Sequence, residues 1–145
     1  MLRGIPNIIS PDLLCALAKL GHGDEVVIAD GNFPADTMAE KGTVIYAAGH
    51  GVPEILRAIL SLLPLDTYTE KPVALMKLVE GDTCKTPEIW GTYERILAEF
   101  EPEHHEIEFM DRFDFYERAK KASLIIATSE TAIYANILIK KGVVL

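Results

Sequence analysis

Residues 25–30 read Glu-Val-Val-Ile-Ala-Asp, a short stretch that is apolar on both faces of an extended chain. Strands of this kind lie in sheets whose two faces are both covered, whereas half-exposed strands alternate apolar and polar residues. The stretch therefore predicts a central strand that lies between two layers of helices. It ends at Asp30 and is followed by Gly-Asn, a pair typical of turns.

Helical and strand patterns alternate on either side of this strand. Ser10 is expected to cap the first helix, which starts at Pro11 and stops before Gly21. Further helices are predicted over 53–63, 87–100 and 113–121, from apolar residues spaced three and four apart. Further strands are predicted over 43–47, 73–79, 107–110, 124–128 and 134–139. The alternation indicates one domain over residues 1–145 with a three-layer α/β/α fold and a mostly parallel central sheet.

Composition excludes several classes of protein. The 145 residues carry 14 Lys and Arg against 22 Asp and Glu, a net charge of −8 without a basic stripe, so we expect no nucleic-acid partner. No uninterrupted apolar run approaches the roughly 18 residues of a membrane span, and the N-terminus lacks a signal peptide's apolar region. The two cysteines, Cys15 and Cys84, are too few for a disulfide framework. We therefore expect a cytoplasmic protein without a membrane partner.

Two polar stretches flank the central strand. Asp30 lies at its carboxyl end, which is where open α/β sheets bind ligands. His22 precedes the strand in Gly-His-Gly-Asp, and an imidazole between two glycines is accessible and titrates near neutral pH. The alternative is structural: Asp30 as a turn former and His22 as a surface residue of a loop whose glycines are needed for their backbone angles.

Three further side chains are candidates for ligand contacts. Arg112 follows a predicted strand and could clamp a ligand's oxygens, or could pair with Asp111 or Asp114. Tyr134 and Asn136 are two residues apart, so on a strand they share one face and could point into one pocket. A tyrosine that merely packs is the alternative.

Other motifs carry less chemistry. His50 lies in a second Gly-His-Gly that suits a turn, and residues 99–108 combine His104 and His105 with five glutamates. Oxygen-rich clusters of this kind are usually solvated, so we expect no metal there. The chain contains no phosphate loop, dinucleotide fingerprint, nucleophile elbow or zinc signature.

Six short motifs resemble the ribose pyranase and fucose mutarotase family, the fucose mutarotase branch above all. They run in order from end to end of the chain: Ile9-Ser-Pro-Asp-Leu-Leu14; Gly21-His-Gly-Asp-Glu25; Asp30 with Phe33-Pro-Ala35; Val79-Glu-Gly-Asp-Thr83; Arg112-Phe113 with Phe115-Tyr-Glu-Arg-Ala119; and Tyr134 with Asn136-Ile-Leu138 and Lys140-Lys-Gly-Val143. Gly31, Ala48 and His50 depart from the residues usual at these positions in the branch.

The resemblance implies a ribose pyranase-like fold and an isomerase that exchanges the α and β anomers of L-fucose without a cofactor. It implies that His22 is the proton donor and that five residues contact the sugar, namely Asp30, Arg112, Tyr134, Ala135 and Asn136. It further implies a homo-oligomer, a decamer of two stacked pentameric rings with pockets near subunit boundaries.

Three other functions stay open at this point. A ribose pyranase would interconvert the pyranose and furanose forms of D-ribose. A monosaccharide-binding protein would bind both anomers without faster exchange. A purely structural ring protein would bind no sugar.

Overall fold

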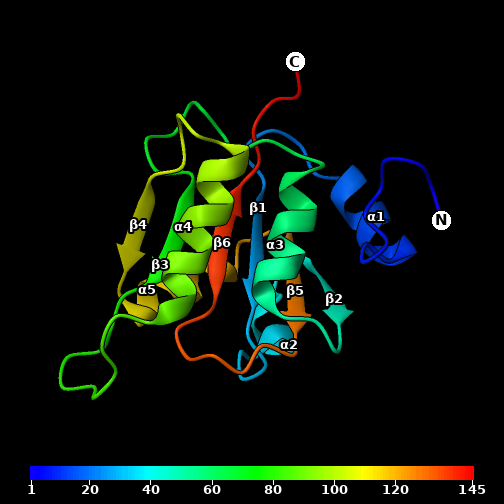
Figure 1. Ribbon diagram of the computed structural model, residues 1–145. Coiled ribbons are helices and arrows are strands. Elements are labelled where there is room, and N and C mark those ends of the chain that lie inside the picture. Colours follow the sequence, from blue (N-terminus) through cyan, green and yellow to red (C-terminus); the bar gives the residue numbers. More distant parts are fainter.

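The computed structural model describes residues 1–145 as five helices and six strands (Figure 1). The helices are α1 (Pro11–Ala18), α2 (Ala35–Met38), α3 (Val52–Leu60), α4 (Glu88–Phe100) and α5 (Arg112–Ala119). The strands are β1 (Glu25–Ala29), β2 (Thr43–Ala47), β3 (Val73–Met76), β4 (Ile107–Met110), β5 (Leu124–Thr128) and β6 (Ile137–Lys140).

The six strands form one sheet in the order β2-β5-β1-β6-β3-β4. β1 pairs in parallel with β5, β5 with β2, and β3 with β4. β6 alone runs in the opposite direction, antiparallel to both β1 and β3. The prediction of a mostly parallel sheet is confirmed, with one reversed strand inserted near its centre.

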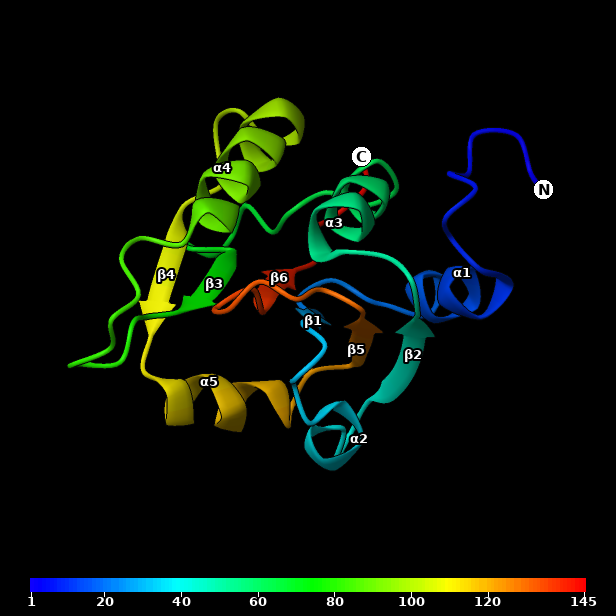
Figure 2. The same cartoon turned by 60° about the horizontal axis from the view of Figure 1, so that its bottom comes forward.

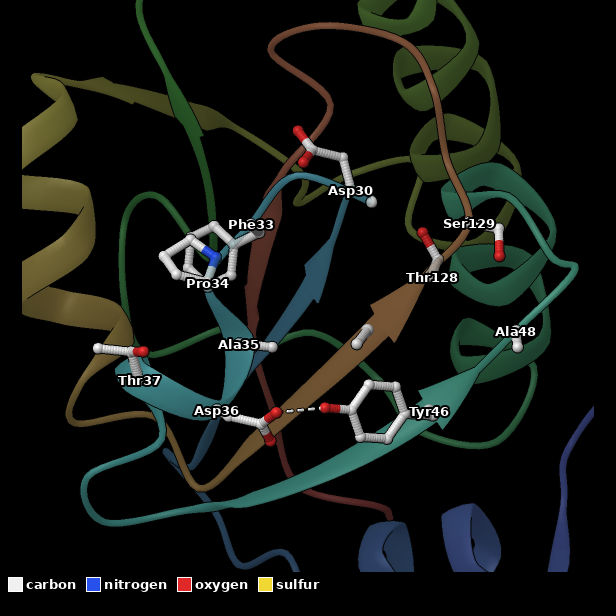
Figure 3. Close-up of a pocket in the computed structure, with 12 residues that line it drawn as sticks. Asp30, Phe33, Pro34, Ala35, Asp36, Thr37, Tyr46, Ala48, Thr128 and Ser129 are labelled. Carbon is white, nitrogen blue, oxygen red and sulfur yellow. Dashed lines mark hydrogen bonds between the residues drawn. The ribbon is translucent and has the colours of Figure 1, made fainter.

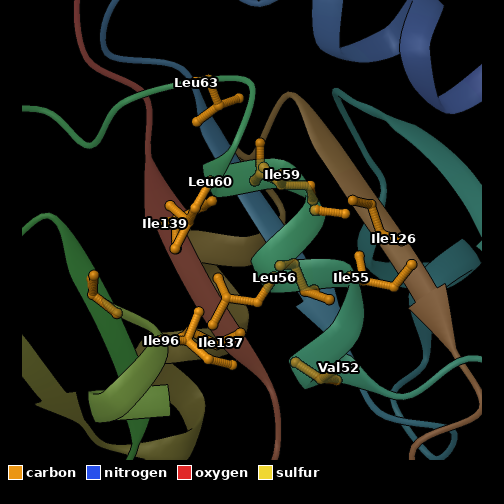
Figure 4. Close-up of a cluster of buried hydrophobic side chains, with 14 of the residues drawn as sticks. Val52, Ile55, Leu56, Ile59, Leu60, Leu63, Ile96, Ile126, Ile137 and Ile139 are labelled. Carbon is orange, nitrogen blue, oxygen red and sulfur yellow. The ribbon is translucent and has the colours of Figure 1, made fainter. Parts of the chain in front are cut away.

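Helices cover both faces of the sheet, as predicted from residues 25–30, which are apolar on both faces of the strand. Figure 2 shows α1, α3 and α4 on one side and α2 and α5 on the other. The first side packs a cluster of 22 buried residues, in which α3 lies across β1, β5 and β6 (Figure 4). The second side packs a smaller cluster of 11 buried residues around Phe115 of α5. Val26 and Ile28 face the first cluster and Val27 and Ala29 face the second, so β1 is fully buried.

Three predicted elements differ from the observed bounds by three residues at one end. The helix expected over 53–63 spans 52–60, and the strand expected over 73–79 ends at Met76. The last strand was predicted from Tyr134, and this is wrong: β6 begins at Ile137. The physical reason is the backbone of Tyr134, whose φ of 56° is left-handed and incompatible with an extended strand.

The direction of each strand determines at which of the two edges of the sheet its connecting segments lie. The segments that follow β1, β3, β4 and β5 all emerge at the carboxyl edge, and the segment that precedes the reversed β6 joins them there. The segments that precede β1 and β3, together with the end of β6, lie at the amino edge. Asp30 therefore lies at one edge and His22 at the other.

The longest helix, α4, has 13 residues, and no helix combines the length and the apolar character needed to cross a bilayer.

Candidate functional site

A pocket of about 200 Å³ opens at the carboxyl edge of the sheet. It brings together residues from the segments after β1, β3 and β4 and from the segment before β6. Four of the residues predicted for sugar contacts line it, namely Asp30, Arg112, Tyr134 and Asn136. The other lining residues are Asn32, Phe33, Met76, Val79, Tyr116 and Ile133.

Asp30 and Asn136, which both line this pocket, are joined by two hydrogen bonds. The backbone N–H of Asp30 donates to Oδ1 of Asn136 at 2.8 Å, and Nδ2 of Asn136 donates to Oδ2 of Asp30 at 3.0 Å. The backbone N–H of Asn32 donates to the other carboxylate oxygen of Asp30 at 2.9 Å. Asp30 is 8% exposed and Asn136 is 7% exposed. The pair therefore fixes the carboxylate before any ligand arrives.

The protonation of Asp30 is shifted by its surroundings. Burial raises the pKa of the Asp30 carboxyl, because the charged form is poorly solvated there, and the negative charge of Glu130 acts in the same direction. Hydrogen bonds from the backbone of Asn32 and Phe33 and from the amide of Asn136 oppose the shift without cancelling it. A carboxyl with a raised pKa holds and releases a proton closer to neutral pH than an exposed one.

Arg112, the first residue of α5, presents a free guanidinium to the pocket. Neither acidic neighbour binds it: Asp111 pairs instead with Lys77 at 2.9 Å, and Arg112 forms no salt bridge within the chain. Its guanidinium carbon lies 5.6 Å from the ring centre of Phe113 and 6.0 Å from that of Tyr116. The aromatic rings support the cation and leave its N–H donors for a ligand.

Tyr134 and Ala135 form the turn before β6. The Tyr134 hydroxyl donates to Asp82 and accepts from the backbone N–H of Val79 at 3.2 Å. Ala135 is fully buried, and its carbonyl accepts from the Tyr93 hydroxyl at 2.6 Å. Tyr134 and Asn136 thus share a pocket because of a turn and not because of strand alternation, while Ala135 lies behind them.

A second hollow of about 320 Å³ adjoins the first across Asp30. Figure 3 shows the Asp30 carboxylate turned away from the hydrogen-bonded pair of Tyr46 and Asp36 on the far side of this hollow. Thr128 and Ser129, which also line it, bond to the protein's own backbone groups. The polar groups aimed at a ligand therefore belong to the first pocket.

His22 lies at the amino edge, where it bonds to a buried acid. Its Nε2–H donates to Oδ1 of Asp66 at 2.9 Å, and the carboxylate fixes that tautomer because it can only accept. The His22 side chain is 45% exposed, whereas that of Asp66 is 3% exposed. The imidazole also packs against the ring of Tyr68, with centroids 5.2 Å apart. The lone pair of Nδ1 is left without a partner in the chain.

Burial acts to raise the pKa of Asp66, but stronger combined effects lower it. These are the hydrogen bonds from His22 and from the backbone of Tyr68, together with the positive charge of Lys140, whose Nζ lies 4.0 Å from Oδ2. Asp66 is therefore a stable carboxylate that orients His22.

The side chains of the other histidines bond to residues that line neither hollow. Nδ1 of His50 lies 3.2 Å from Oε1 of Glu54 at the start of α3. His104 and His105 each bond to a backbone carbonyl, that of Thr69 and that of Glu101.

Two of the residues that sequence reasoning missed contact predicted site residues: Tyr116 lies beside Arg112, and Asp66 bonds to His22. Tyr116 follows Arg112 by four positions, a spacing that places both on one face of α5, so the helical periodicity could have identified it. Asp66 lies in a connection between α3 and β3, and no spacing relates it to His22, which is 44 positions away. Only the folded chain reveals that pair.

The chain is similar to known proteins over almost its whole length. The model of the RbsD / FucU transport protein family matches residues 3–144. The fucose mutarotase of Mus musculus is 51% identical over 145 residues, covering 97% of this chain and 94% of the mouse protein. The L-fucose mutarotase of Histophilus somni (strain 2336) is 46% identical over 143 residues, covering 99% of this chain and 97% of that protein.

Solved structures show the same similarity in three dimensions. The fucose mutarotase of Streptococcus pneumoniae, crystallised with L-fucose, superposes with a TM-score of 0.92 at 47% identity and covers 99% of this chain and 100% of that one. Bacillus subtilis RbsD complexed with D-ribose superposes with a TM-score of 0.73 at 23% identity, covering 100% of both chains, a likeness of fold alone.

The lowered pKa of Asp66 predicts how its contribution to stability depends on pH. Because the folded pKa lies below the unfolded value of about 3.9, the contribution is complete above that value and is lost as pH falls through the folded pKa. We expect Asp66→Asn to lower the free energy of unfolding by about 1–3 kcal/mol at pH 7. The loss shrinks below about pH 4. Urea denaturation at several pH values measures this dependence.

Asp30→Asn serves as the control, because the pKa of Asp30 is shifted in the other direction. Above its raised folded pKa, the ionised Asp30 lowers the free energy of unfolding. This destabilisation disappears as pH falls through that pKa and the carboxyl becomes protonated. The wild-type protein therefore gains stability relative to Asp30→Asn in acid. Parallel pH trends for the two variants would refute the assignment.

Proposed function

The chain belongs to the RbsD / FucU transport protein family, and within it we propose that the protein is a fucose mutarotase, an isomerase that interconverts the α and β anomers of L-fucose. The curated relatives at 44–51% identity over almost the full chain carry that name. The similarity to the ribose-bound RbsD is far lower, at 23% identity, which favours the fucose branch over a ribose pyranase.

One observation supports the proposed site most strongly. Asp30, Arg112, Tyr134 and Asn136 come from three separate segments and line one pocket. The pocket offers a fixed carboxylate, a guanidinium without a salt bridge, a phenol and an amide, which together can bind several hydroxyl groups. The rings of Phe33 and Tyr116 supply apolar surface for the carbon face of a sugar.

Anomer exchange needs only proton transfer. A base removes the proton from O1 while an acid protonates the ring oxygen, so the C1–O5 bond breaks and an open-chain aldehyde forms. Rotation about C1–C2 and reclosure with the reverse proton transfers give the other anomer. A single acid/base group contributes about 10²–10⁴-fold, which is enough for a reaction that already proceeds in water.

We assign this proton transfer to His22, with Asp66 holding the imidazole. The exposed Nδ1 exchanges a proton with O1 or the ring oxygen, while Nε2–H is fixed on Asp66. Asp30 orients the reacting end or binds a hydroxyl, and Arg112, Tyr134 and Asn136 hold the sugar. Ala135 contributes through the backbone turn that places its two neighbours.

His22 acts in a pocket of a second copy of the chain. It precedes β1 and Asp30 follows it, and a strand of this length separates the two ends by about 17–20 Å. A histidine side chain does not span that distance. The proposed reaction centre therefore needs the amino edge of one subunit to meet the carboxyl edge of another.

Such a contact joins two different patches and is heterologous, and a heterologous contact generates a closed ring when its rotation closes. This supports a ring-shaped homo-oligomer, which we propose is a pentameric ring that stacks with a second one as a decamer. The cysteines, Cys15 and Cys84, are both free, in keeping with the proposed cytoplasmic location.

Magnetisation-transfer NMR tests the function directly, because it measures the rate of exchange between the two anomers. We expect His22→Ala to abolish most of the acceleration that the protein causes. The wild-type protein should accelerate exchange between the anomeric signals of L-fucose, and His22→Ala should lower that rate by about 10²–10⁴-fold because the proton-transfer group is missing. Exchange confined to D-ribose would instead identify a pyranase. Sugar binding without faster exchange would identify a binding protein.

His50→Ala is the matched control, because His50 also lies in Gly-His-Gly but does not line the pocket. The rate of anomer exchange catalysed by the His50→Ala protein should stay within about twofold of the wild-type rate, as for an ordinary surface substitution. A His22→Ala protein that stays folded and oligomeric with a wild-type rate would disprove the role of His22.

Mixing two inactive variants tests whether the site is shared between subunits. His22→Ala and Asp30→Ala are each expected to be inactive. When they are co-refolded in equal amounts, about a quarter of the heterologous contacts pair an intact His22 with an intact Asp30, so about a quarter of the wild-type activity returns. Activity no greater than the sum of the separate variants would show that each site lies within one subunit.

A further inference from the structure

Tyr134 has an unusual backbone. Its φ of 56° makes it the one non-glycine residue of the chain with a positive φ. Glycine, asparagine and aspartate adopt this left-handed region most readily, whereas a bulky aromatic residue does so only when its surroundings impose it. The turn before β6 must therefore be held by other parts of the structure.

Two side chains of α4 hold the backbone of this turn. Nε1–H of Trp90 donates to the carbonyl of Tyr134 at 2.9 Å, and the Tyr93 hydroxyl donates to the carbonyl of Ala135 at 2.6 Å. Trp90 and Tyr93 are three positions apart, so they project from the same face of α4 onto consecutive carbonyls. Neither residue lines the proposed sugar pocket.

Both donors are rigidly placed. Tyr93 is fully buried, and burial raises the pKa of its phenol, so the hydroxyl stays a donor across the working pH range. The Trp90 ring packs against Phe109 of β4, with centroids 5.1 Å apart. Two consecutive carbonyls with their oxygens fixed leave the main chain at Tyr134 little freedom to relax.

The opposite end of Tyr134 faces the segment between β3 and α4. Its hydroxyl meets Asp82 and the backbone N–H of Val79. The main chain of Tyr134 is thus bonded to α4, while its phenol is bonded to the segment after β3 and lines the pocket together with Val79.

We propose that Trp90 and Tyr93 are positioning residues for the mutarotase site: their hydrogen bonds hold the left-handed turn that places the Tyr134 phenol on the sugar. This inference rests on the proposed function, because it assigns the phenol of Tyr134 to sugar binding. Trp90 and Tyr93 act through the turn and touch no substrate.

Trp90→Phe removes the N–H donor and keeps an aromatic ring against Phe109. We expect kcat/KM for fucose exchange to fall about fivefold, the size that one lost neutral hydrogen bond implies, mainly through a higher KM. In a Tyr134→Ala protein, which has no phenol to place, the same Trp90→Phe change should have almost no effect. Equal losses in both backgrounds would overturn the inference.

Tyr93→Phe repeats the test with the other donor, and so covers the case in which Trp90→Phe fails to fold. Ser61→Ala is the matched control, since it removes a hydroxyl that donates to the Ala58 carbonyl near the end of α3. It should leave kcat/KM unchanged. If Ser61→Ala lowered kcat/KM as much as Trp90→Phe and Tyr93→Phe do, the effect of those two variants would be a general loss of stability, and the inference would be overturned.

Fluorescence of Trp90 reports sugar binding beside the turn independently of exchange, while the comparison of Trp90→Phe with and without the Tyr134 phenol separates positioning from a structural role. Trp90 is the single tryptophan of the chain, so L-fucose binding beside Tyr134 should change its emission with a saturable titration. If the wild-type protein exchanges the anomers normally, but the losses caused by Trp90→Phe and Tyr134→Ala simply add in the double variant, only this inference is overturned. Absence of both exchange and sugar binding in the wild-type protein would overturn the proposed function and this inference together.

Discussion

The reversed direction of β6 is the constraint on which the site depends. Because β6 runs antiparallel between β1 and β3, the residues before it lie beside the residues that follow both neighbours. Asn136 can therefore bond to both the main chain and the carboxylate of Asp30. A parallel β6 would carry Asn136 to the opposite edge and leave a buried carboxylate without its amide partner. The pocket is thus a result of strand direction as much as of residue identity.

The two buried aspartates show how the same side chain serves two purposes. Asp30 has a raised pKa because burial outweighs its neutral hydrogen-bond donors, and Glu130 adds negative charge nearby. Burial acts to raise the pKa of Asp66 as well, but His22, the backbone N–H of Tyr68 and Lys140 together lower it below its ordinary value. One carboxyl is suited to a change of protonation and the other to holding a partner in place. The positively charged partners of Asp66, which Asp30 lacks, account for the opposite direction of its shift.

Much of the fold could be predicted from the sequence, because strands such as Val26–Ala29 are apolar on both faces and so require two layers of helices. The direction of β6 could not, since its apolar residues suit either orientation. The carboxyl-edge rule pointed to Asp30, and in the structure Arg112 lines the same pocket. The left-handed turn at Tyr134 escaped prediction because Trp90, 44 positions earlier in the chain, stabilises it through a single hydrogen bond. Local patterns carry no trace of such a contact.

In the proposed site, the separation of His22 from Asp30 by the length of β1 makes folding and catalytic competence two different events. Both hydrophobic clusters close within one copy of the chain, so a lone subunit has what it needs to fold. With His22 and the sugar pocket in the proposed roles, that subunit is a folded protein with no working reaction centre. The activity per chain then depends on association equilibrium, and dilution lowers the turnover of each chain without unfolding any of them.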